Sequence, residues 1–277
     1  MKVLRIIGVV LICILLFASL MSLGTTETLE KSTKFKNVEE KFTSLSRTFI
    51  KESIDLEPII KQALPFMKAY CTNNTVYSLK QNGYSFNISC DSINKGTDAI
   101  IDNIIDETVS SFIKNYYYEN YECEFIDCLR QNKPLVLISE KAHEYWKDQS
   151  NLLLLVSLGL AIILFFLTKR KTNFFILAGG LTTLTGIVVS QLPEIASNIA
   201  RTAFSPASSM LTQLGASSDI FMKVAKAFFS QAENVYIWFI LIGIALIVFG
   251  ILSKIFNIIE KITKLFPKSK KKKEESE

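Results

Sequence analysis

The stretch "NLLLLVSLGLAIILFFLTKRKTNFFILAGGLTTLTGIVV", residues 151–189, joins two long apolar runs through three consecutive cations, Lys169, Arg170 and Lys171. The uncharged runs span residues 149–168 and 172–193. Each is long enough for a helix across a hydrocarbon core, which needs about 20 residues. The pattern therefore predicts a helical hairpin in a membrane, with a tight basic turn.

Two further runs without charge, residues 6–26 and 234–253, have the same length and character. The 277-residue chain is 49% hydrophobic, with a mean hydropathy of +0.29. A soluble protein would have to bury four such helices without a single charge in any of them, which is unusual. The predicted fold class is a membrane protein, predominantly α, with four transmembrane helices.

The first run leaves two interpretations open. Residues 1–24 have a basic start, an apolar stretch and small residues near the end, as in a signal peptide with cleavage after Gly24. The uncharged run is long for a signal peptide, which favours a retained transmembrane anchor. Cys13 is expected to be an ordinary apolar residue of this helix.

The cations predict the orientation, because Lys and Arg near membrane ends favour the cytoplasmic side. They precede the first run at Lys2 and Arg5, link the second to the third, and follow the fourth from Lys254. Four crossings place all three groups on one side. We therefore expect an integral protein of the cell membrane, with both termini cytoplasmic if the first segment is retained.

Aromatic residues support the same orientation. Tyr145 and Trp146 precede the second run, and Tyr236 and Trp238 open the fourth, so both pairs are expected at the outer interface. The predicted organisation has six parts: anchor or signal peptide, outer domain, helical hairpin, outer amphipathic helical loop, last span, and cytoplasmic amphipathic helix with polybasic tail. Their boundaries are residues 1–24, 25–150, 151–192, 193–234, 235–253 and 254–277.

Charge is divided between the two sides of the membrane. Residues 25–150 hold 15 Lys and Arg against 19 Asp and Glu, a net charge of −4. Residues 254–277 hold 8 Lys against 4 Glu, a net charge of +4. The basic balance is therefore a membrane-orientation signal and gives no argument for nucleic acid. The tail is expected to bind anionic lipid on the cytoplasmic side through Lys268, Lys270, Lys271, Lys272 and Lys273.

Four of the five cysteines, Cys71, Cys90, Cys123 and Cys128, fall in the outer domain, where an even number predicts two disulfides. Residues 71–90 resemble a β-hairpin with an Asn82–Gly83 turn, which favours pairing Cys71 with Cys90. The short "EFID" loop favours pairing Cys123 with Cys128. Free buried cysteines remain an alternative, and a zinc site a weaker one.

The rest of the outer domain is expected to be helical. An apolar stripe at spacings of three and four covers residues 35–49, Pro58 suits the start of a second helix, and residues 101–116 form a third. Ser139 is a candidate N-cap for a helix that continues without a break into the second membrane run. Residues 195–204 and 219–232 predict two amphipathic helices in the second outer loop.

No motif of catalysis or cofactor binding is recognised in the sequence, so we expect a protein without enzymatic activity, cofactor or metal. The single histidine, His143, is expected on an exposed helix face. Asp98, Asp102 and Asp106 are four residues apart and are interpreted as a solvated face rather than a cation site. Asn73 and Asn87 begin N-glycosylation sequons.

Small residues, Ala178, Thr182 and Gly186, recur along the third run and permit close helix contact. Packing within the bundle is the favoured interpretation, and self-association is the alternative. The functional hypothesis is a cell-envelope membrane protein whose disulfide-stabilised outer domain binds a protein or glycan or assembles a complex, with a protein partner or homo-oligomer. The alternative is an oligomeric channel or a membrane-remodelling protein.

Overall fold

The computed structural model describes residues 2–53, 57–81, 84–131, 133–204, 226 and 229–265. This part of the chain is mostly helical and contains one two-stranded antiparallel sheet. The chain divides into two compact units. We call Met1–Gly24, Asn151–Ser190 and Glu233–Glu277 the apolar unit, and Thr25–Ser150 with Gln191–Ala232 the bridged unit.

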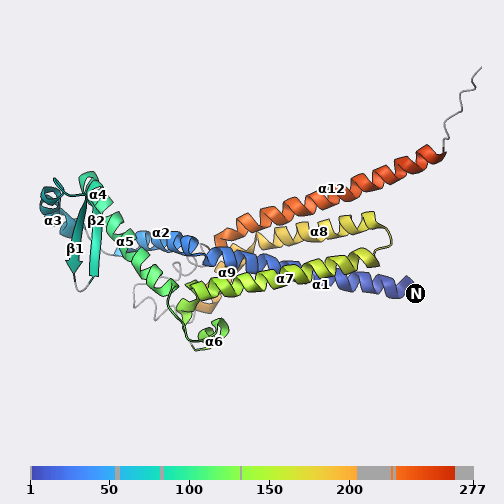
Figure 1. Ribbon diagram of the computed structural model, residues 1–277, viewed down its shortest axis with the longest axis horizontal. Coiled ribbons are helices and arrows are strands. Elements are labelled where there is room, and N and C mark those ends of the chain that lie inside the picture. The colour runs from blue at the N-terminus through green and yellow to red at the C-terminus, as the bar shows by residue number, and fades with distance from the viewer. Residues whose placement is uncertain are drawn as a thin grey trace, which may run out of the picture. The chain divides into compact units, whose positions relative to one another are not determined.

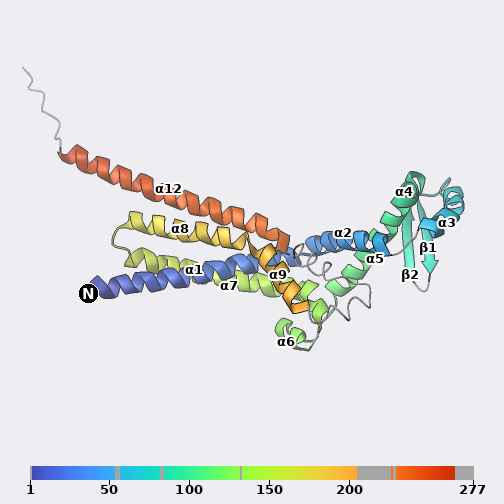
Figure 2. The same cartoon turned by 180° about the vertical axis from the view of Figure 1, so that it is seen from behind.

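Four described helices are long and apolar enough to cross a membrane, and they contribute to the apolar unit. They are α1 (Lys2–Thr33), α7 (Glu140–Leu167), α8 (Lys171–Val189) and α12 (Ala232–Leu265) (Figures 1 and 2). Only Thr168 to Arg170 separate α7 from α8, so the predicted tight hairpin is confirmed. Many apolar side chains remain exposed on these helices, which suits helices solvated by lipid rather than by water.

Hydrogen bonding and close backbone contact hold these helices together. The hydroxyls of Ser19 on α1 and Ser157 on α7 form a buried hydrogen bond of 2.8 Å. A Cβ atom on Gly179 of α8 would lie 2.6 Å from the carbonyl oxygen of Gly243 on α12. Because neither glycine carries a side chain, α8 and α12 approach backbone to backbone.

The basic groups gather at one end of the apolar unit. Arg5, near the start of α1, donates a hydrogen bond of 2.7 Å from Nε to the carbonyl oxygen of Leu167, the last residue of α7. A Cβ on Gly250 of α12 would lie 3.1 Å from the carbonyl oxygen of Thr172 on α8. Lys254 is about one turn beyond Gly250. The N-terminal, linking and C-terminal cations therefore share one end of the unit.

The last helix is longer than the sequence indicated. We expected the span to end at Ser253 and a separate amphipathic helix to follow. Instead, α12 continues without interruption to Leu265, because no proline or glycine follows Gly250 until Pro267. The tail lysines, Lys268 and Lys270 to Lys273, lie outside the described residues.

The bridged unit contains the sheet and the shorter helices. Its elements are α2 (Phe35–Ser53), α3 (Glu57–Tyr70), β1 (Val76–Gln81), β2 (Tyr84–Ser89), α4 (Cys90–Lys95), α5 (Thr97–Tyr117), α6 (Phe125–Arg130), the 3₁₀ helix η1 (Pro134–Ile138), α9 (Leu192–Phe204) and η2 (Phe229–Gln231). The predicted hairpin is confirmed: the register pairs Val76 with Ser89 and Gln81 with Tyr84. Its expected turn, Asn82–Gly83, lies outside the described residues.

Isoleucine dominates the core beneath the hairpin. Ile88 of β2, Ile93 of α4 and Ile100 of α5 are fully buried and belong to one cluster. The buried residues of α3, Ile60 and Met67, belong to the same cluster. Figure 1 shows α3, α4 and the two strands gathered around the first half of α5. Another side of α5 packs on α2 from Asp102 to Tyr117, and that pair forms the surface described below.

Other helix predictions have mixed outcomes. The helices expected at residues 35–49, from Pro58, and at 101–116 are confirmed as α2, α3 and α5. The Ser139 cap is also confirmed, since its Oγ accepts a hydrogen bond of 3.3 Å from the Ala142 backbone N–H at the start of α7. In the second loop α9 is confirmed, and most of residues 219–232 lie outside the described residues. Tyr145 and Trp146 pack on Phe125, and their place at the outer interface stays a prediction.

Candidate interaction surface

The two helices α2 and α5 bury an apolar seam on one side and enclose a polar groove on the other. Val38 of α2 and Ile113 and Tyr117 of α5 are buried in the seam. The groove has a volume of about 800 Å³. Its lining is polar throughout: Lys36, Glu39, Glu40, Thr43, Ser44, Arg47, Asn103, Asp106, Glu107, Ser110, Ser111 and Lys114.

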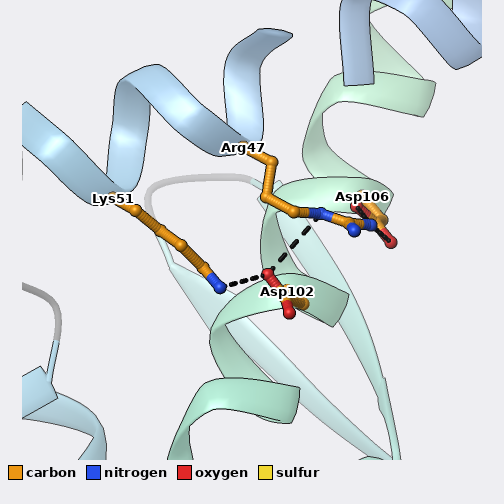
Figure 3. A network of polar contacts seen from close by, with 4 residues as sticks. All are labelled: Arg47, Lys51, Asp102 and Asp106. Atoms are coloured by element: carbon orange, nitrogen blue, oxygen red, sulfur yellow. Dashed lines mark hydrogen bonds and ion pairs between the residues drawn. The ribbon is translucent and has the colours of Figure 1, made fainter. Parts of the chain in front are cut away.

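An ion-pair network ties the two helices together beside this groove (Figure 3). Arg47 of α2 donates from Nη2 to both carboxylate oxygens of Asp106 at 2.6 Å, and its Nε lies 3.5 Å from Oδ1 of Asp102. Lys51, one turn further along α2, lies 2.7 Å from the same Asp102 oxygen. Two cations therefore balance two carboxylates, and the network needs no external ion.

This network corrects one expectation from the sequence. Asp98, Asp102 and Asp106 were interpreted as a solvated face, but Asp102 and Asp106 bind cations of α2, whereas Asp98 is exposed. The hydrogen bond to Asp106 is the largest cause that raises the pKa of Arg47 above its usual value, so this side chain stays charged. No pattern within α5 alone indicated a partner, because the cations come from a helix about 55 residues earlier.

The remainder of the groove offers hydrogen-bonding groups from both helices. Ser110 donates a hydrogen bond to Glu39 across the groove. Asn103 accepts a bond of 3.1 Å from the Ser89 backbone N–H, which fixes its amide beside the sheet. Hydroxyls, one amide and charges of both signs line the walls. Such a lining suits a polar, hydrogen-bonding ligand or a polar protein surface.

His143 lies elsewhere, on α7, and is half-buried rather than exposed, so that expectation is wrong. Its Nδ1 is 3.0 Å from the carbonyl oxygen of Glu30, in the last turn of α1. Carbonyl groups in that turn have no backbone N–H partner within their own helix. The Glu30 oxygen accepts a bond of 3.1 Å from the Thr33 hydroxyl, and the imidazole of His143 supplies a second contact. No sequence pattern indicated this contact, because 113 residues separate the two groups.

Both disulfides of the described chain lie in the bridged unit. Cys71 is bonded to Cys90 at the open end of the hairpin, and Cys123 to Cys128 around the start of α6. These are the pairs that the loop lengths favoured. Cys13 is a free thiol in α1.

The predicted small-residue face of α8 lies partly against α12. Ala178 and Gly186 are buried, and Thr182 is half-buried with its hydroxyl donating to the Ala178 carbonyl oxygen at 2.8 Å. A Cβ on Gly186 would lie 3.0 Å from the Tyr236 carbonyl oxygen. Gly179, which the sequence placed only beside this face, approaches α12 more closely than Gly186 does, since a Cβ there would lie 2.6 Å from the Gly243 carbonyl oxygen.

Comparison with known proteins adds no relative: no protein-family model, curated protein or solved structure matches this chain.

Proposed function

We propose that this chain is an integral membrane protein whose bridged unit, outside the cytoplasm, binds a partner through the groove between α2 and α5. One observation carries the orientation, and the polar lining of the groove supports binding there. Three groups of cations gather at one end of a four-helix apolar unit, while both disulfides lie in the other unit. Cations favour the cytoplasmic side and disulfides form in oxidising compartments, so the two features agree on one orientation.

The link between α7 and α8 also suits a membrane surface. The Lys171 ammonium group donates to the Phe165 carbonyl oxygen at 2.8 Å and lies 3.8 Å from the centre of the Phe165 ring. Its charge is thereby held at the end of the apolar helices, where it meets lipid headgroups.

Orientation is tested by labelling the full-length protein with a membrane-impermeant maleimide. The background carries Cys13→Ser, and single cysteines are placed at Lys169 in the link or at Thr108, exposed on α5. On intact cells we expect label at Thr108→Cys and none at Lys169→Cys, with both labelled after permeabilisation. The opposite pattern would overturn the proposal.

Binding through the groove is tested by photocrosslinking in native membranes. A photoreactive amino acid at Ser111, which lines the groove, should capture a partner. The matched control is the neighbouring Phe112, which is exposed on α5 but does not line the groove. Equal products at both positions, or none at Ser111, would show that the groove is not the binding surface.

The alternative of an oligomeric channel or membrane-remodelling protein draws on the small-residue face of α8 and on the apolar second loop, most of which lies outside the described residues. Gly179 and Gly186 contact α12 of the same chain. With those positions used internally, the binding function is the better-supported proposal.

A further inference from the structure

One face of α3 is apolar and open to solvent. The helix buries Ile60 and Met67 in the core, yet Ile59, Phe66 and Tyr70 are 64%, 76% and 49% exposed. Their spacings of seven and four residues place them along one stripe. An exposed apolar stripe next to a packed core is unfavourable in water unless something covers it.

A glycosylation sequon, Asn73-Asn74-Thr75, follows this helix directly. It lies in the turn between α3 and β1, and the side chains of Asn73 and Thr75 are exposed. Tyr70 is the last residue of α3, so at most about 11 Å of chain separates it from Asn73. A group attached to Asn73 can therefore reach the apolar stripe.

The second sequon is a poorer acceptor. Asn87 pairs with Ser78 in the sheet, and its Oδ1 accepts a hydrogen bond of 2.7 Å from the Ser78 hydroxyl. The hydroxyl of Ser89, the third sequon residue, already accepts a bond of 3.3 Å from the Asp91 N–H and caps α4. A transferase would have to unpair this strand before it could bind Asn87.

We propose that Asn73 carries an N-linked glycan whose first sugars lie over Tyr70 and Phe66. A membrane transferase would supply the sugar from a lipid-linked oligosaccharide. The Asn73 Nδ2 forms a bond to C1 of the first sugar, and the C1–O bond to the lipid phosphate breaks. The phosphate leaves with the electron pair, and the amide loses one proton to base.

The chemistry of the stripe suits this occupant. Sugar rings present C–H groups on one face, which pack on aromatic rings, while their hydroxyl groups stay in water. The sugars would thus shield the uncharged stripe from water while their hydroxyl groups remain hydrated, and no protein partner is needed. The inference rests on the proposed function, because the transferase acts only on a translocated unit.

Peptide mapping of protein purified from its own membranes tests both statements at once. Trypsin cuts after Lys68, Lys80 and Lys95, so Asn73 and Asn87 fall in separate peptides, each with one cysteine of the Cys71–Cys90 bridge. We expect linked peptides before reduction, and sugar mass on the Asn73 peptide after it. A linked but sugar-free Asn73 peptide overturns the glycan alone. Free thiols at both cysteines overturn the orientation.

The cover is tested with variants from the same host. Asn73→Gln should lose the sugar mass and bind an apolar fluorescent dye at least twice as strongly. Asn74→Gln leaves the sequon intact and should change neither. Adding Phe66→Ser to Asn73→Gln should return dye binding toward the native level. Loss of the glycan with unchanged dye binding would show that the sugar lies elsewhere.

Discussion

At the scale of single residues, substitution of Arg47 is the strongest test of the ion pairs between α2 and α5. Arg47→Met would leave Asp106 without its cation and Asp102 with Lys51 alone. These side chains are 34–42% exposed, so solvent screens the pair, and we expect a loss of about 0.5–1 kcal/mol in unfolding free energy. Chemical denaturation followed by circular dichroism measures it.

Arg130→Met is the matched control for this change. Arg130 is 78% exposed and lies 3.5 Å from Asp127 within the same short helix, so its loss should be close to zero. An equal loss for the two variants would mean that the α2–α5 ion pairs add nothing specific.

Two buried tyrosines predict a loss of stability in alkali. Burial, and then the charge of Glu140, raises the pKa of Tyr117 to about 12, and burial, and then Glu119, raises that of Tyr121 to about 12. A pKa raised on folding means that the neutral phenol is favoured in the folded state. The stabilisation is complete below about pH 10 and is lost as pH rises toward 12.

The measurement is the denaturation midpoint at pH 9 and pH 11.5, for the native protein and for Tyr117→Phe. The native protein should lose about 1–3 kcal/mol more over this interval than the variant, which has no phenol to ionise at that position. Identical losses would show that Tyr117 is not responsible.

At the scale of helices, the glycine contacts give a sharp comparison. A Cβ at Gly179 would meet backbone atoms of α12 at 2.6 and 2.9 Å, and backbone cannot rotate away. Gly179→Leu should therefore separate α8 from α12 and destabilise the apolar unit by about 1–3 kcal/mol or more. Thermal unfolding in detergent measures this loss.

Gly180→Leu is the control, because no atom of another described helix lies within 4 Å of a Cβ there. The two substitutions have the same composition and hydropathy and are one residue apart. If both variants melted at the same temperature, the close α8–α12 contact would be wrong.

The helices themselves were largely predictable, and their partners were not. The apolar stripe at residues 35–49 predicted that α2 has a buried face. Such periodicity describes one helix and says nothing about the element that covers its face. It could not show that α5 covers that face, or that Arg47 and Lys51 meet Asp102 and Asp106. The cysteines were more informative, because a hairpin and a four-residue loop restrict which thiols can meet.

At the scale of the whole molecule, the two tryptophans report on different units. Trp146 belongs to the bridged unit and Trp238 to the apolar unit, and the chain has no other. Replacing both Cys71 and Cys90 by Ser should lower stability by about 3 kcal/mol, given the 19-residue separation of the bridge. In a Trp238→Phe background Trp146 is the single tryptophan, and its fluorescence during denaturation should show a lower unfolding midpoint for the bridged unit.

With Trp146→Phe instead, the signal of Trp238 should keep its native midpoint, because no disulfide lies in the apolar unit. Equal shifts for both reporters would contradict the prediction and show that the chain unfolds as one cooperative unit.

The contacts between α8 and α12 also constrain how the chain can change in length. Gly179 and Gly186 are seven residues apart, and so are Gly243 and Gly250 on the opposing helix. Seven residues make almost two full turns, so the two glycines of each helix lie on the same face, one above the other. A single-residue insertion within either helix would rotate every later contact by about 100° out of the seam. Insertions of seven residues in both helices together would preserve the seam and produce a longer span, suited to a thicker bilayer.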